Sequence, residues 1–197
     1  MKRTVIIGAG SWGAALAALW AKDARPVSLW GNNAERIARV QETRENSDYL
    51  PGVRLPNNVS ATHGLDDCAK ADLIVFVTPS LALREIATRV RDAGVKNGIT
   101  LLSCTKGIEH GSGMRMSEIL SEIFPANPIA VLSGPNLAVE VVRGLPTATV
   151  IGSANENCAM ELQRFLGSEH FRIYTSDDVV SIELGGALKN VFAIAAG

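Results

Sequence analysis

Short apolar runs alternate along the chain with longer amphipathic stretches, and this alternation predicts an α/β fold. The predicted strands are almost entirely apolar or β-branched, which is typical of a parallel sheet buried on both faces. They cover residues 4–7, 26–30, 72–77, 99–104, 129–132, 147–151 and 171–174. Helices are predicted at 14–21, 81–91, 114–124, 138–142 and 156–166. We therefore predict a doubly wound, mostly parallel sheet of the Rossmann type.

The first predicted strand runs directly into the glycine turn, defined as residues 8–13 with the sequence GAGSWG. A buried strand, a GxGxxG pattern and a following helix are together typical of a dinucleotide-binding unit. Gly8 permits the tight turn, Gly10 lets the backbone approach a pyrophosphate, and Gly13 lets the helix pack closely on the strand. The helix N-terminus favours the negative charge of that pyrophosphate. The turn therefore predicts a nicotinamide dinucleotide, NAD or NADP, as cofactor.

The end of the second predicted strand bears on the choice between NAD and NADP. An acidic residue is usually found there to bind the ribose, but this chain continues with Gly31, Asn32 and Asn33. Without a carboxylate, a 2′-phosphate is not repelled, and Arg36 or Lys22 could pair with it. This favours NADP, although these cations equally fit a solvated helix face.

Further along the chain, polar residues follow predicted strands at the edge where ligands bind in such sheets. Residues 44–58 form a polar, proline-bearing excursion of the kind that is often functional. Thr78 follows the strand at 72–77, and Lys106 follows the strand at 99–104, where a cationic substrate contact is expected. Gly134 follows the strand at 129–132 and permits close backbone approach.

The last predicted helix, within 177–197, carries Lys189 one turn after Gly185 and Gly186. Small residues at this position suit a flat group packed against the helix. Apolar neighbours are expected to desolvate the ammonium group of Lys189. Desolvation, or a nearby cation such as Lys106, would lower its pKa toward a value useful for proton transfer. A solvated lysine on an amphipathic helix is the alternative.

The composition excludes several other classes of protein. The chain has 197 residues, of which 47% are hydrophobic and 5% aromatic, and a net charge of −1, so nothing indicates nucleic-acid or membrane-surface binding. No apolar segment reaches the roughly 18 residues of a membrane span. Glycines interrupt the N-terminal apolar run, which argues against a signal peptide. Cys68, Cys104 and Cys158 lack metal-binding spacing and predict buried thiols in a cytoplasmic protein without a metal site.

Six motifs in order resemble those of the bacterial NAD(P)-dependent glycerol-3-phosphate dehydrogenases, and the resemblance covers the whole chain. They are GAGSWGAALA from Gly8, TKGIE from Thr105, LSGPNLAVEV from Leu132, GLPTATV from Gly144, YTSDDV from Tyr174 and ELGGALKNV from Glu183. The resemblance implies a cytoplasmic, usually homodimeric oxidoreductase. Such an enzyme transfers a hydride from NAD(P)H to dihydroxyacetone phosphate and gives sn-glycerol 3-phosphate for phospholipid synthesis.

The resemblance also implies roles for individual residues. Cofactor contacts would come from Ser11, Trp12, Asn32, Asn33, Lys106 and Ala138. Substrate contacts would come from Lys106, Gly134 and Asn136, and Lys189 would be the catalytic lysine that donates a proton to the nascent alkoxide.

Three departures from the family pattern qualify these expectations. The family commonly has a basic residue near Asn32, and it usually has serine or threonine followed by phenylalanine where this chain has Asn136 and Leu137. The family also continues into an all-helical second domain with a phosphate-binding arginine. We therefore expect residues 1–178 to form the dinucleotide-binding domain and residues 179–197 to be the first helix of a truncated substrate domain. On this expectation, the chain binds cofactor but turns over weakly or not at all.

Two alternative functions remain open from the sequence. A β-hydroxyacid or 6-phosphogluconate-type dehydrogenase shares the cofactor domain and a helix-borne lysine, and it would replace the phosphoketone by a carboxylate substrate. A non-catalytic nicotinamide-nucleotide-binding module fits the short length but leaves Lys106 and Lys189 unexplained.

Overall fold

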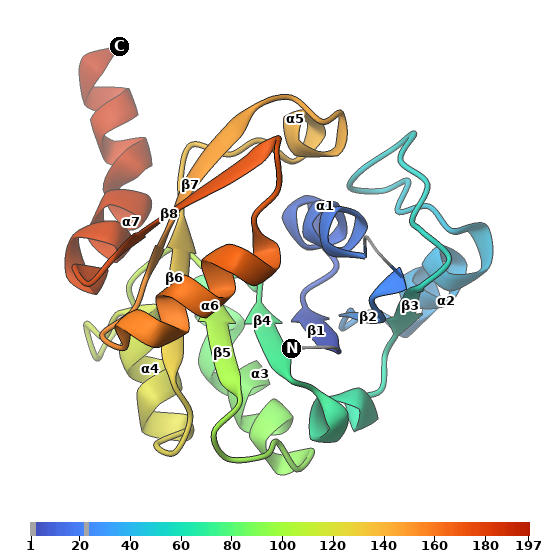
Figure 1. The fold of residues 1–197 in the computed structure, drawn as a ribbon, viewed down its shortest axis with the longest axis horizontal. Helices are drawn as coiled ribbons and strands as arrows, with labels where there is room; N and C mark the ends of the chain where they lie inside the picture. Colours follow the sequence, from blue (N-terminus) through green and yellow to red (C-terminus); the bar gives the residue numbers. More distant parts are fainter. Residues whose placement is uncertain (1–2, 22–23) are drawn as a thin grey trace.

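The computed structural model describes residues 3–21 and 24–197, without the side chain of Asn190 (Figure 1). Its strands are β1 (Thr4–Ile7), β2 (Val27–Trp30), β3 (Val59–Thr62), β4 (Leu73–Phe76), β5 (Thr100–Ser103), β6 (Ile129–Ser133), β7 (Thr147–Gly152) and β8 (Phe171–Ser176). Its helices are α1 (Ser11–Trp20), α2 (Ala34–Thr43), α3 (Ser80–Asp92), α4 (Met116–Ile123), α5 (Ala138–Val142), α6 (Glu156–Leu166) and α7 (Val179–Ala196), with a short 3₁₀ helix, η2, at Asp66–Lys70. Lys22, a candidate partner for a 2′-phosphate, lies outside the described residues.

The strands form one sheet in the order β3-β2-β1-β4-β5-β6-β7-β8. Neighbouring strands are parallel except for β6 and β7, which are antiparallel. Thr4 pairs with Val27 on one side and with Leu73 on the other, so β1 lies between β2 and β4. The order reverses at β1 and β4, and ligands of open α/β sheets bind beside the carboxyl ends of the strands at such a reversal. The predicted doubly wound, mostly parallel fold is confirmed.

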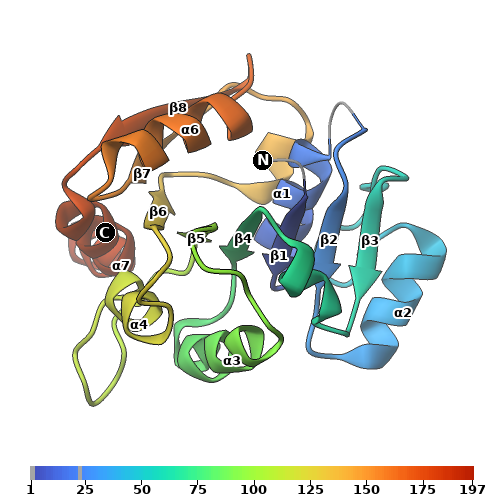
Figure 2. The same ribbon diagram turned by 60° about the horizontal axis from the view of Figure 1, so that its bottom comes forward.

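Both faces of the sheet are buried because successive strand residues point to opposite sides. Ile6 of β1 and Val75 of β4 belong to one apolar cluster, which also contains α1, α2 and α6 residues. Ile7 and Phe76 belong to a second cluster with residues of α3 and α4. Figure 2 shows α1 and α6 on one side of the sheet and α3 and α4 on the other.

Strand β3 and the short helix η2 were not predicted from the sequence, and β3 is the only strand among the described residues that was missed. It pairs only with β2 at the edge of the sheet. Only Val59 and Ala61 of its four residues are buried, so its sequence lacks the apolar run that marks the central strands. The predicted helices are present: α5 and α6 have the predicted bounds, and α1, α3 and α4 have shifted ends. Helix α1 begins at Ser11, which places the residues after Gly10 in its first turn.

Helix α7 continues through Gly185 and Gly186 without a break. It begins at Val179, where the expected second domain begins, and the division of the chain into two domains remains a prediction. Figure 1 shows the C-terminal half of α7 projecting from the body of the molecule. Among the described residues, none of the helices combines the length and the apolar character of a membrane span.

Candidate functional site

The three glycines of the glycine turn have different surroundings. Gly8 has a φ of +126°, and a Cβ there would lie 2.1 Å from the carbonyl oxygen of Val77. A Cβ on Gly13 would lie 1.8 Å from the carbonyl oxygen of Gly8, so α1 packs against the turn at this point. A Cβ on Gly10 would meet no atom within 4 Å. Gly8 and Gly13 are therefore required by the fold, whereas Gly10 leaves space open for a ligand.

The N-terminus of α1 presents hydrogen-bond donors to this open space. Among the described residues, the backbone N–H groups of Gly10, Ser11 and Trp12 have no hydrogen-bond partner. The first turn of α1 contains no acidic residue, and no side chain caps it. Free N–H groups and the positive end of the helix dipole stabilise an anion. The turn therefore fits the pyrophosphate of a dinucleotide.

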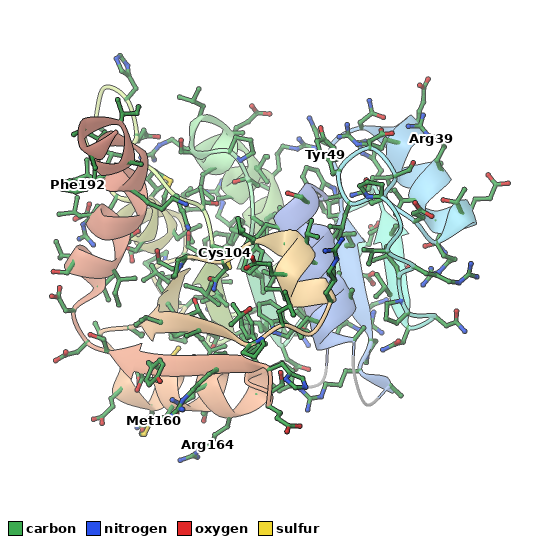
Figure 3. All side chains as sticks on the ribbon, turned by 90° about the horizontal axis from the view of Figure 1, so that it is seen from above. Arg39, Tyr49, Cys104, Met160, Arg164 and Phe192 are labelled. Carbon is green, nitrogen blue, oxygen red and sulfur yellow. The ribbon has the colours of Figure 1, made fainter. Side chains whose placement is uncertain are left out.

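The two asparagines after β2 are held by the protein's own donors. The Oδ1 of Asn33 accepts a 2.8 Å hydrogen bond from the backbone N–H of Arg36 and so caps α2. The Oδ1 of Asn32 accepts a 3.2 Å hydrogen bond from Nη1 of Arg89. The guanidinium of Arg36 stacks on the ring of Tyr49, which is labelled in Figure 3. Two arginines thus lie at the expected ribose position, and Arg89 was not predicted because it comes from α3, far away in sequence.

A cavity of about 350 Å³ lies between the N-terminus of α1 and the ends of β5 and β6. It brings together half of the predicted site residues; Gly8, Gly10, Gly13, Asn32, Asn33 and Lys189 do not line it. The predicted site residues that line it are Ser11, Trp12, Lys106, Gly134, Asn136 and Ala138. Cys104, near the centre of Figure 3, also lines the cavity, and burial raises the pKa of its thiol to about 12. This thiol therefore stays protonated and unreactive.

A second cavity, of about 330 Å³, shares Lys106, Ser133 and Gly134 with the first. Gly185, Gly186 and Lys189 of α7 line its other side. Lys106 therefore stands where the two cavities meet, and α7 brings Lys189 toward it.

Lys106 carries the electrostatic perturbation of the site. Its Nζ donates a 3.1 Å hydrogen bond to the carbonyl oxygen of Gly134. Desolvation holds the pKa of Lys106 below its ordinary value of 10.5, and the positive charge of Lys189 lowers that pKa further. The side chain of Lys106 still reaches solvent.

The expectation that apolar neighbours desolvate Lys189 is wrong for this chain. Lys189 is exposed. Val191 and Phe192 are 60% and 67% exposed, because no described residue covers the second half of α7. Phe192 lies at the edge of the molecule in Figure 3. The predicted proximity of Lys106 and Lys189 is present; both residues are exposed, and the pKa lowered by desolvation is that of Lys106.

Close packing explains two further glycines. A Cβ on Gly134 would lie 2.9 Å from both Asn136 Oδ1 and Thr149 Oγ1. A Cβ on Gly186 would lie 2.7 Å from Ser133 Oγ, so a larger residue there would require the Ser133 side chain to move. Gly185 has no atom within 4 Å of its Cβ position and faces open space.

Hydrogen bonds fix the strand ends around Gly134. The Nδ2 of Asn136 donates a 2.8 Å hydrogen bond to the carbonyl oxygen of Ala148, and Thr149 Oγ1 donates a 2.8 Å hydrogen bond to the carbonyl oxygen of Ser133. Ser133 and Thr149 were not identified from the sequence. Their role depends on the antiparallel pairing of β6 with β7, which no local pattern predicts.

Comparisons with known proteins agree with this geometry. Residues 3–159 match the family model described as NAD-dependent glycerol-3-phosphate dehydrogenase N-terminus. Among curated proteins, glycerol-3-phosphate dehydrogenase [NAD(P)+] of Clostridium tetani is 39% identical over 100% of this chain and 56% of its own length. The protein of the same name from Rhodopseudomonas palustris is 43% identical over 98% of this chain and 58% of its own length.

Solved structures give the same result. The crystal structure of glycerol-3-phosphate dehydrogenase from Coxiella burnetii matches with a TM-score of 0.92 and 34% identity, over 98% of this chain and 59% of that one. The chain thus spans somewhat more than half the length of the relatives that it matches. It belongs to the family of NAD-dependent glycerol-3-phosphate dehydrogenases, whose N-terminal region it matches.

Proposed function

We propose that this chain binds a nicotinamide dinucleotide with its pyrophosphate on the glycine turn. The observation that carries the proposal is the open space at Gly10, which faces the free N–H groups of Gly10, Ser11 and Trp12. From there, the 350 Å³ cavity leads to Lys106 and Ala138, which supports a nicotinamide ring near the ends of β5 and β6. When bound, the cofactor supplies the hydride.

The reaction we propose for the whole protein is the reduction of dihydroxyacetone phosphate to sn-glycerol 3-phosphate. Its relatives carry the name of this activity, and the second cavity supports it. Lys106 and Lys189 line that cavity, and its described lining residues include no Asp or Glu. Two cations without a carboxylate favour an anionic substrate such as a phosphate ester.

Within this reaction, Lys106 orients the substrate and Lys189 donates the proton to the alkoxide oxygen. Gly134, which lines both cavities, and Asn136, which lines the first, contact the substrate where the cavities meet, and Gly185 leaves the α7 side of the second cavity open. Ser11, Trp12, Asn32, Asn33 and Ala138 contact the cofactor. A carboxylate substrate, as in β-hydroxyacid dehydrogenases, would use the same two cations, so a panel of phosphoketones and hydroxyacids distinguishes the two activities.

We propose NADP as the preferred cofactor. The guanidinium of Arg89 lies beside Asn32, Arg36 follows Asn33 in the first turn of α2 with its guanidinium against Tyr49, and no acidic side chain contacts either asparagine among the described residues. A 2′-phosphate would gain charge-assisted hydrogen bonds from these groups. Side-by-side fluorescence titrations with NADPH and NADH test both proposals. Binding of neither cofactor by the folded chain refutes cofactor binding, and tighter binding of NADH refutes the preference.

We also propose that the protein works as a cytoplasmic homodimer. The exposed apolar residues of α7, Val191, Phe192 and Ile194, support an association surface because large exposed apolar patches usually mark interfaces. Sedimentation tests the dimer, and a monomer at all concentrations refutes it.

A further inference from the structure

The excursion at residues 44–58 contacts the glycine turn through one buried side chain, that of Asn46. This residue is 1% exposed, and its Nδ2 donates a 3.0 Å hydrogen bond to the carbonyl oxygen of Ala9. Its Oδ1 is buried and has no partner among the described residues. A buried amide with an unpaired oxygen reduces stability. The packing of the excursion alone therefore gives no reason for an asparagine at this position.

The geometry of the peptide bond connects Asn46 to the proposed anion site. In a planar trans peptide, the C=O of Ala9 and the N–H of Gly10 point in opposite directions. A hydrogen bond that holds the Ala9 carbonyl toward Asn46 therefore turns the Gly10 N–H away from the excursion. That N–H has no partner among the described residues, and Gly10 leaves space open for a ligand.

The excursion in turn holds Asn46 in place. The backbone carbonyl of Asn46 accepts hydrogen bonds from the N–H groups of Tyr49, at 3.2 Å, and Leu50, at 2.7 Å. Leu50 is 2% exposed and belongs to the same apolar cluster as α1. The two ends of the excursion are joined by a 2.7 Å hydrogen bond from the N–H of Leu55 to the carbonyl oxygen of Arg44. Asn46 is thus a fixed donor to the Ala9–Gly10 peptide, which makes no other hydrogen bond among the described residues.

We propose that Asn46 is a positioning residue for the cofactor: it orients the Ala9–Gly10 peptide so that the Gly10 N–H faces the pyrophosphate. This inference rests on the proposed function of the glycine turn. It adds a residue, remote in sequence from the turn, that contacts no part of the cofactor and acts through one carbonyl oxygen.

The test replaces Asn46 with leucine, which has a similar size and no donor. Asn58→Leu is a matched control, because Asn58 lies on the same excursion and its Nδ2 also donates to backbone carbonyls, those of Ala21, at 2.6 Å, and Arg25. Those carbonyls lie away from the glycine turn. Circular dichroism establishes that each variant folds. NADH fluorescence gives its dissociation constant, and displacement of NADH gives those of ADP and adenosine.

Asn46→Leu is expected to weaken the binding of NADH and ADP about tenfold, the value of one misdirected hydrogen bond to a charged group. Adenosine carries no phosphate, so its affinity stays unchanged, and Asn58→Leu leaves all three affinities unchanged. An equal loss for ADP and adenosine shows a merely structural role and overturns the inference. Unchanged NADH affinity, or an equal loss in Asn58→Leu, also overturns it.

A second variant covers the case in which Asn46→Leu does not fold. Asn46→Asp keeps the shape of the side chain, and its carboxylate accepts but does not donate hydrogen bonds. The same selective loss of NADH and ADP affinity is expected, and unchanged affinity overturns the inference. Failure of the wild-type chain to bind NADH refutes the proposed function itself. Binding by the wild type with unchanged variants refutes only the role of Asn46.

Discussion

Replacement of Gly10 by alanine separates the folding role of the glycine turn from its binding role. Gly10 has φ −78° and ψ −173°, a conformation that alanine adopts readily. Its Cβ would meet no atom within 4 Å. Gly10→Ala is therefore expected to fold normally, while its methyl group stands where the pyrophosphate would approach the backbone.

Two small effects on stability oppose each other in this variant. Loss of glycine flexibility in the unfolded chain stabilises the fold by about 0.4–1 kcal/mol. Alanine is a poorer N-cap than glycine for α1, which costs roughly 0.5–1 kcal/mol. The net change stays within about 1 kcal/mol, or about 2–4 °C in Tm for a chain of this length. Gly13→Ala is the contrasting variant, because a Cβ 1.8 Å from the Gly8 carbonyl oxygen costs at least about 3 kcal/mol.

The expected effect of Gly10→Ala on binding is much larger. A methyl group that displaces the pyrophosphate from two backbone donors removes two charge-assisted hydrogen bonds, which corresponds to about 100-fold weaker binding or more. Thermal unfolding followed by circular dichroism and titration with NADH measure the two quantities on the same sample. If Gly10→Ala binds NADH as tightly as the wild type, the assignment of the pyrophosphate to this turn is refuted.

Three other perturbations test the interactions around the site. Glu183 of α7 is buried, and its carboxylate accepts a 2.7 Å hydrogen bond from Arg115 at the start of α4, so Glu183→Ala should lower the free energy of unfolding in urea by about 3–5 kcal/mol. Glu118→Ala removes a half-exposed partner of the same arginine and should cost about 1 kcal/mol, and equal losses would show that the Glu183 carboxylate does not hold α7 on α4. Hydrogen bonds from Arg84 lower the pKa of Glu109 from 4.5 to about 2, so this contact stabilises the fold above pH 4.5 and the stabilisation is lost as the pH falls toward 2. In Glu109→Gln, the free energy of unfolding measured in urea should depend less on pH over that range. An unchanged pH dependence argues against the contact. An anion bound between the lysines raises the lowered pKa of Lys106, so titration calorimetry in buffers of different ionisation enthalpy should show proton uptake with dihydroxyacetone phosphate as the pH approaches 10.5 from below, and its absence would remove Lys106 from the substrate site.

The sequence predicted the parts of the fold that depend on local pattern. Buried strands such as Leu73–Phe76 are continuous apolar runs, and the glycine turn predicts a strand before it and a helix after it. Edge strand β3 was missed because only alternate residues face the core. The position of Lys106 directly after a predicted strand also correctly placed it at the edge of the sheet where the strands end, beside the first cavity.

Features that depend on distant contacts could not be predicted from local pattern. Arg89 reaches Asn32 across 57 positions of sequence, and Asn46 reaches Ala9 across 37. Lys189 lies on a helix whose apolar pattern suggested burial, but whether such a face is covered depends on what packs against it. Its exposure here follows from the absence of a cover among the described residues.

The charge arrangement connects these observations to the chemistry. The positive charge of Lys189 lowers the pKa of Lys106 because β5 and α7 hold the two side chains beside one cavity, and the described lining provides no carboxylate to offset their repulsion. Folding alone gains nothing from that repulsion. The hydrogen bond from Lys106 to the Gly134 carbonyl holds the ammonium at the junction of the two cavities. An anionic substrate in the second cavity would relieve the repulsion, because it attracts both ammonium groups. This attraction would act at the junction that the ring of a bound cofactor approaches from the first cavity.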